Sequence, residues 1–139
     1  METVYVHVDN VVVYITKITY LLYKMEIKDV IGNNIMETNM DVEILVDLEH
    51  HLNDLFRWQI SFYIDFPIQS TFGEYYSLYI GDDIDIPSDD DPDNPNTIMA
   101  IYTSKFDSHE EEVFSLRTTL EQIFNLLKLV EHFTEQVTK

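Results

Sequence analysis

Aspartates are concentrated in one short segment of the chain, and their spacing raises the question of calcium binding. Asp89, Asp91 and Asp93 stand at alternating positions, as the first ligands of an EF-hand loop do. The rest of that motif is missing, because Asn94 occupies the position of the required glycine and Ala100 that of the closing bidentate glutamate. The spacing therefore favours a solvated acidic loop, open to a protein partner, over a calcium site.

Other patterns of catalytic or metal-binding residues are missing from the sequence. The adjacent His50 and His51 lack the H-E-x-x-H spacing of zinc proteases and have no obvious third ligand. The chain has three glycines and no phosphate-binding loop, no G-x-S-x-G nucleophile motif, and no cysteine for a thiolate site. We therefore expect neither an enzyme nor a bound metal or cofactor.

Net charge is the most informative property of the chain. Its 139 residues include 26 Asp and Glu against 8 Lys and Arg, which gives a net charge of −18. No Lys or Arg occurs between Trp58 and Ser104. A protein this acidic repels nucleic acid and anionic membranes and attracts basic surfaces. The sequence thus predicts a basic protein as partner, most readily a nucleic-acid-binding enzyme, and no direct contact with nucleic acid or membrane.

Composition separates this chain from a disordered acidic tail. Apolar residues make up 45% of it and aromatic residues 13%, which is enough to build a buried core. We therefore expect one folded domain over residues 1–139. No run of 18 apolar residues and no basic signal-peptide region occurs, and cysteine is absent, so we expect a cytoplasmic protein.

The first element that the sequence predicts is a β-hairpin. Residues 4–8 and 11–15 alternate between apolar and other side chains on either side of Asp9 and Asn10. A two-residue turn at this point pairs Val8 with Val11, Val6 with Val13 and Val4 with Ile15, all on one face, so turn and pattern agree. Residues 17–31 fit either a strand or a helix and end in a Gly-Asn-Asn turn.

Residues 40–66 are compatible with two different structures. Apolar residues alternate along 40–48 and again along 58–66, which predicts a second hairpin. Its outer face would carry carboxylates from Asp41, Glu43, Asp47, Glu49 and Asp65. Residues two apart on a strand point the same way and lie about 6.6 Å apart, so Glu43, Asp47 and Glu49 would form a spaced row. The alternative is a helix over 42–56 with leucines along one side. β-Branched residues at the inner positions favour the hairpin.

An aromatic strand and an acidic loop follow. Alternation predicts a strand after Gly73 and another over residues 97–102. Between them, residues 81–96 contain three prolines and seven aspartates, which predicts a loop. The candidate partner-binding residues of this region are Tyr75, Tyr79, Asp82, Asp83, Asp85, Asp89, Asp90, Asp91 and Asp93.

The last segment is predicted as a helix from about residue 109 to residue 137. Ser108 and Glu111 have the spacing of a capping box, and apolar residues follow at intervals of three and four. This stripe favours packing across a sheet, and a second hypothesis assigns its heptad positions to a homodimer. Those positions are Val113, Leu116, Leu120, Ile123, Leu127 and Val130. The expected fold is α+β, with an antiparallel, hairpin-rich sheet packed against a long C-terminal helix.

Together these features predict a protein that acts by binding another protein. Carboxylates can stand where nucleic acid presents phosphates, and tyrosine and phenylalanine can supply the apolar anchors of an interface. The leading hypothesis is an inhibitory mimic of nucleic acid that occupies the basic groove of a nuclease, restriction enzyme or CRISPR-type effector, as phages and mobile elements use against host defences. The alternatives are an immunity or antitoxin protein for one basic toxin, and an acidic structural or dimerisation module.

Overall fold

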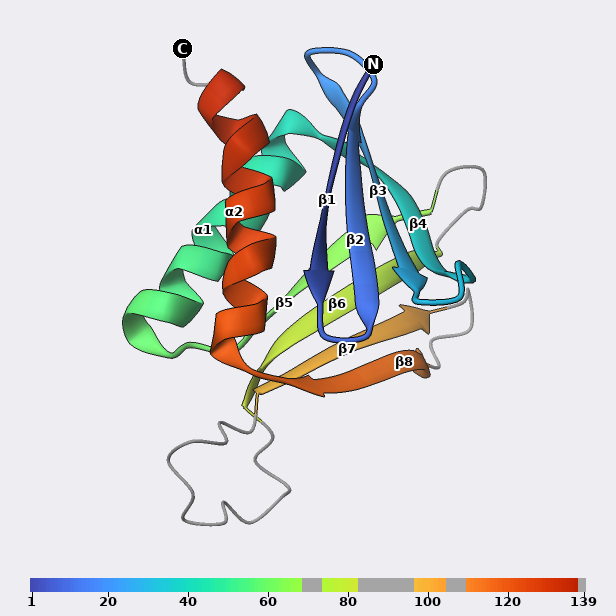
Figure 1. Cartoon of the computed structure of the whole chain (residues 1–139), viewed down its shortest axis with the longest axis vertical. Helices are drawn as coiled ribbons and strands as arrows, with labels where there is room; N and C mark the ends of the chain where they lie inside the picture. Colours follow the sequence, from blue (N-terminus) through green and yellow to red (C-terminus); the bar gives the residue numbers. More distant parts are fainter. Residues whose placement is uncertain (69–73, 83–96, 105–109, 138–139) are drawn as a thin grey trace.

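Two four-stranded antiparallel sheets and two helices make up the computed structural model (Figure 1). The structure describes residues 1–68, 74–82, 97–104 and 110–137. The first part of the chain contains β1 (Glu2–Val8), β2 (Val11–Lys17), β3 (Leu22–Asp29), β4 (Asn34–Asp41) and α1 (Val42–Trp58). The second contains β5 (Phe62–Pro67), β6 (Tyr75–Asp82), β7 (Thr97–Ser104), β8 (Glu110–Thr118) and α2 (Leu120–Val137). The predicted α+β class, with antiparallel strands and a C-terminal helix, is confirmed.

The order of elements repeats, since four consecutive strands and then a helix occur twice. The strand order is β1-β2-β3-β4 in the first sheet and β5-β6-β7-β8 in the second, so each sheet is a simple meander. The two helices pack against each other, and α2 also lies alongside β1 and contacts β2 (Figure 1). This repetition was not predicted from the sequence.

The predicted N-terminal hairpin is confirmed in its turn and its register. Val8 pairs with Val11 across the turn, and the alignment continues along both strands. Asp9 has a φ of 50°, in the left-handed region that aspartate tolerates better than most residues. The ambiguous segment 17–31 contains β3, which pairs with β2 and β4, so the strand interpretation of this segment is correct.

The hairpin predicted over residues 40–66 is wrong, because Val42–Trp58 form helix α1, close to the alternative helix over 42–56, and strand β5 pairs with β6. The Asp41 carboxylate accepts a hydrogen bond from the backbone N–H of Ile44 at 2.8 Å and caps the helix. A helix brings four leucines to one buried face, which the strand pattern would have divided between two faces. Those leucines are Leu45, Leu48, Leu52 and Leu55. Burial of this face outweighed the β propensity of Val42 and its neighbours.

The long C-terminal helix is shorter than predicted, because Glu110–Thr118 form strand β8 along β7. Helix α2 begins at Leu120, and the Thr119 hydroxyl accepts a hydrogen bond from the backbone N–H of Gln122 at 3.2 Å. Thr119 therefore has the capping role that the sequence assigned to Ser108, a residue outside the described part of the chain.

One buried cluster includes residues from both sheets and both helices. Met25 and Ile27 enter it from the first sheet, Leu78 from the second, and Phe133 from α2. Polar contacts also join the layers. The buried hydroxyl of Thr38 on β4 donates to the backbone carbonyl of Pro67 on β5 at 3.0 Å. Among the described residues, no helix combines the length and the apolar character that crossing a membrane requires.

Candidate functional site

Tyrosine side chains gather on the outer face of the second sheet. Successive residues of a strand point to opposite faces, and the register therefore decides which side chains meet. Tyr63 on β5 pairs with Tyr79 on β6, and Asp65 on β5 pairs with Ser77 on β6. Ser77 also pairs with Tyr102 on β7. The residues between these positions belong to the buried cluster or pack against it, so this face points away from the core.

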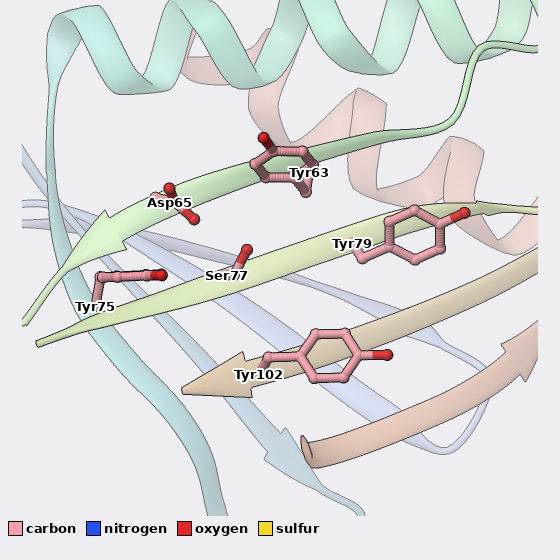
Figure 2. Close-up of a pocket in the computed structure, with 6 residues that line it drawn as sticks. All are labelled: Tyr63, Asp65, Tyr75, Ser77, Tyr79 and Tyr102. Carbon is pink, nitrogen blue, oxygen red and sulfur yellow. The ribbon is translucent and has the colours of Figure 1, made fainter. Parts of the chain in front are cut away.

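These side chains line an open hollow of about 470 Å³ (Figure 2). The lining residues, which we call the tyrosine cup, are Tyr63, Asp65, Tyr75, Ser77, Tyr79 and Tyr102. Ser77 lies at the centre and is only 6% exposed. A small residue at the centre with large ones around it leaves the space that forms the cup.

Standard strand geometry gives the dimensions of the cup. Tyr75 and Tyr79 are separated by four residues along β6, which corresponds to about 14 Å. Asp65 and Tyr102 stand on the strands at either side of β6, two strand spacings or about 10 Å apart. An opening of this size admits a side chain or a short segment of a partner chain.

The cup is electrostatically negative. Asp65 is its charged member, and Glu112 on β8 pairs opposite Tyr102. No Lys or Arg occurs in β5, β6 or β7. Arg117 is the one base in the described strands of this sheet, and it pairs with Ile98, four residues or roughly 14 Å along β7 from Tyr102. The cup therefore favours a cationic ligand over an anionic one.

Helix α1 adds a row of exposed carboxylates. Glu43, Asp47 and Asp54 lie within about 40° of one another around the helix axis. The rise from Glu43 to Asp47 is about 6 Å. We call these three residues the α1 acidic stripe. Arg57 lies one turn beyond Asp54 at the end of the helix, with its guanidinium 6.0 Å from the centre of the Trp58 ring.

A second hollow connects this stripe with the cup. It has a volume of about 460 Å³ and is lined by His51, Asp54, Ile60, Ser61, Phe62 and Tyr63. Asp54 belongs to the α1 acidic stripe, and Tyr63 also lines the cup. The stripe, the second hollow and the cup thus form one continuous acidic and aromatic surface, on which α1 runs beside β5 (Figure 2). We call it the acidic–aromatic surface.

The predicted site residues are distributed over several places. Asp65, Tyr75 and Tyr79 come together in the cup, because β5 pairs with β6 and not with residues 40–48 as predicted. Glu43 and Asp47 are exposed, but on a helix, so the predicted row of carboxylates along a strand is wrong.

Two other predicted acids have partners within the chain. Asp41 caps α1, and Glu49 accepts a hydrogen bond from the Thr134 hydroxyl of α2. Asp82 ends β6. The remaining predicted acids, Asp83, Asp85, Asp89, Asp90, Asp91 and Asp93, lie outside the described residues.

The heptad stripe proposed for a homodimer is divided between two elements. Val113 and Leu116 lie on strand β8 and not on the helix. Ile123, Leu127 and Val130 do lie on α2, but they are buried in the core of the same chain, and Leu120 packs against that core. The six positions therefore do not form one exposed helical face.

Three members of the cup were missed from the sequence. Tyr63 and Tyr102 occupy outward positions of predicted strands, so their alternation was visible, but only the register of β5, β6 and β7 brings them beside Tyr79. Ser77 contributes through its small size, which no local pattern marks as functional.

Neither metal ligation nor a known relative explains this surface. Among the described residues, no group of three His, Asp or Glu side chains is arranged to hold a metal ion. The sequence matches no protein-family model and no curated protein. The geometry and charge of the acidic–aromatic surface are therefore the basis for a functional proposal.

Proposed function

We propose that this chain binds the basic nucleic-acid-binding groove of another protein and inhibits it by taking the place of the nucleic acid. The observation that carries the proposal is the acidic–aromatic surface, in which the α1 acidic stripe continues through a second hollow into the tyrosine cup. The target class is a nuclease, a restriction enzyme or a CRISPR-type effector.

The distribution of basic residues supports this surface as the binding face. Lys17, Lys24 and Lys28 all lie on the first sheet. Lys24 forms ion pairs with Glu26 at 3.4 Å and Glu37 at 3.7 Å, and Lys28 pairs with Glu26 at 3.6 Å. These pairs offset charge on the first sheet, whereas β5, β6 and β7 carry no base. The field that attracts a basic partner is therefore strongest on the side of the second sheet.

The spacing and chemistry of the surface also fit a mimic. Along the rigid helix α1, the carboxylates of Glu43 and Asp47 are about one turn apart and those of Asp47 and Asp54 about two turns apart, so negative charge recurs along one side of the helix. Tyrosines beside them supply large, amphipathic contact area, which is enriched at interface hot spots. Electrostatic complementarity then speeds association, and the aromatic contacts slow dissociation.

A matched pair of triple variants tests the proposal. One variant neutralises the α1 acidic stripe through Glu43→Gln, Asp47→Asn and Asp54→Asn. The control removes the same charge elsewhere through Asp9→Asn, Glu37→Gln and Glu121→Gln, all at exposed positions. Partners are captured from lysate on the immobilised wild-type protein, and association rates are then measured by surface plasmon resonance.

We expect the captured partner to be a nucleic-acid-binding enzyme that is released at moderate salt. The stripe variant should associate about tenfold more slowly than the control variant, because it loses local steering charge and not merely net charge. Equal rates for the two variants would contradict the assignment of the surface. A partner without a basic groove would contradict the proposed function itself.

Exposed apolar residues beside the surface favour a second candidate, a dedicated immunity or antitoxin protein for one basic toxin. Trp58 is 65% exposed, Ile60 53% and Tyr63 67%. An interface that buries such residues keeps affinity when salt screens the charges. A single partner that stays bound at high salt, and is lost with Trp58→Ala, would favour this candidate over a mimic of broad range.

A further inference from the structure

We propose that the tyrosine cup binds the side chain of an arginine that the partner protein presents. This inference rests on the proposed function, because it specifies what the acidic–aromatic surface takes from a basic partner. It is carried by the composition of the cup, in which one carboxylate and four tyrosines surround a small central residue.

The carboxylate gives the cup its preference for a cation. Asp65 pairs with Ser77 across β5 and β6, so its side chain stands next to the centre of the cup (Figure 2). Covering this carboxylate with an apolar ligand would remove it from water without compensation, which is unfavourable. A cationic donor instead replaces the water with charge-assisted hydrogen bonds. With no Lys or Arg on β5, β6 or β7, the chain supplies no competing cation from these strands.

The tyrosine rings select the kind of cation. A guanidinium is planar, stacks on aromatic faces, and donates two parallel hydrogen bonds to a carboxylate, whereas an ammonium is compact and strongly hydrated. Tyr63 and Tyr79 pair across β5 and β6, and Tyr102 stands on the next strand, so aromatic rings are available on more than one side of the bound group. Cation–π contact of this kind is stronger when the cation is desolvated.

The cup has room for a side chain. A single water molecule needs roughly 10–15 Å³ of such space, and the cup offers about 470 Å³. The Ser77 hydroxyl lies at the centre of the cup, and its oxygen can accept a hydrogen bond from a guanidinium N–H group (Figure 2).

A peptide titration tests the inference without the partner. The probes are three peptides of the form acetyl-Gly-Gly-X-Gly-Gly-amide, in which X is arginine, lysine or citrulline, the uncharged analogue of arginine. Binding to the full chain is followed by two-dimensional amide NMR, which also shows that each variant is folded. We expect the arginine peptide to shift amides of β5, β6 and β7, to bind about fivefold more tightly than the lysine peptide, and the citrulline peptide not to saturate.

Substitutions in the tyrosine cup test whether the arginine peptide binds there. Asp65→Asn should weaken the arginine peptide about tenfold, since the charge-assisted bonds are lost, and Tyr79→Leu should weaken it severalfold. The control Asp9→Asn removes the same charge from the turn between β1 and β2, outside the acidic–aromatic surface, and should change affinity less than twofold. Equal affinities for arginine and lysine, shifts spread over α1, or equal effects of Asp65→Asn and Asp9→Asn would overturn the inference.

The two proposals fail separately. If the arginine peptide does not bind the cup but a nucleic-acid-binding partner is still captured and released by salt, the inference is wrong and the proposed function stands. If the peptide binds as expected but the captured partner has no basic groove, the cup assignment stands and the proposed function is wrong.

Discussion

Substitutions of Asp41 separate the effect of removing a negative charge from the effect of removing a helix N-cap. The sequence placed this residue among the partner-binding acids, whereas the structure gives it a role in the fold. Its carboxylate accepts the backbone N–H of Ile44 at 2.8 Å, and its φ of −80° and ψ of 175° are the extended values of an N-cap. Asparagine retains a side-chain oxygen that can accept the same hydrogen bond, and alanine does not.

We predict that Asp41→Ala is less stable than Asp41→Asn by about 1 kcal/mol, the usual contribution of an N-cap. Both substitutions remove one negative charge from a chain of net charge −18, so any relief of self-repulsion cancels between them. The same pair of substitutions at Asp47, inside α1, provides the control. Alanine has the higher helix propensity there, so Asp47→Ala should be more stable than Asp47→Asn by about 0.5 kcal/mol.

Urea denaturation followed by circular dichroism measures these differences. With a denaturant slope of about 1–3 kcal/mol/M, a difference of 1 kcal/mol moves the midpoint by roughly 0.3–1 M while the slope stays the same. The reasoning is refuted if Asp41→Ala is as stable as Asp41→Asn. It is also refuted if Asp41 and Asp47 show the same order of stability, because a cap and an interior position must differ.

Two further predictions concern the contacts that hold the fold together. Thr38→Val should lower the free energy of unfolding by about 1 kcal/mol, because Thr38 is buried, with 4% of the residue exposed, and the Pro67 carbonyl loses the hydroxyl that donates to it. Urea denaturation checks this, with the exposed Thr3→Val as control, and an unchanged midpoint for Thr38→Val would contradict it. The pKa of Asp29 lies below its ordinary value of 3.8, chiefly because its carboxylate accepts a hydrogen bond from the backbone N–H of Asn33. The stabilisation from Asp29 should therefore be fully present above pH 3.8 and disappear as the pH falls through the lower pKa of the folded state. Unfolding free energies of wild type and Asp29→Ala between pH 6 and pH 2 should thus converge at the acidic end, and a constant difference would contradict the assignment.

The N-terminal hairpin was predictable in detail because two independent signals agreed. The alternation along residues 4–15 sets the faces, and the Asp9-Asn10 turn sets the register, so the pairing of Val8 with Val11 followed directly. For residues 40–48, no second signal supports the alternation of apolar residues. Their apolar positions satisfy the period of a strand and that of a helix, and the leucines further along the chain decide for the helix only once they pack in the core.

The C-terminal helix was predicted too long for a related reason. Val113 and Leu116 continue the spacing of the α2 stripe backwards, which extended the predicted helix too far. The decisive interaction is the pairing of β8 with β7, in which Phe114 aligns with Ile101. Strand pairing depends on a distant segment of the chain, and the periodicity of one segment alone does not reveal it.

The candidate site was predictable only in part for the same reason. Tyr75 and Tyr79 share a face because they lie on one strand, and local alternation is enough to show that. Their meeting with Tyr63 and Tyr102 requires the register between three strands. The α1 acidic stripe likewise required the correct secondary structure, because helical spacing selects Glu43, Asp47 and Asp54, whereas strand spacing had grouped a different set of acids.

The proposal that most needs a test is that the acidic–aromatic surface occupies the nucleic-acid-binding groove of a partner protein. Its most direct test is a competition measurement, in which the captured partner is titrated with fluorescently labelled duplex DNA at increasing concentrations of this protein. We predict that the protein displaces the DNA, that the apparent affinity for DNA falls in proportion to the protein added, and that the stripe variant displaces it less effectively than its charge-matched control. A ternary complex, in which the partner holds DNA and this protein at once with unchanged affinity, would contradict the account.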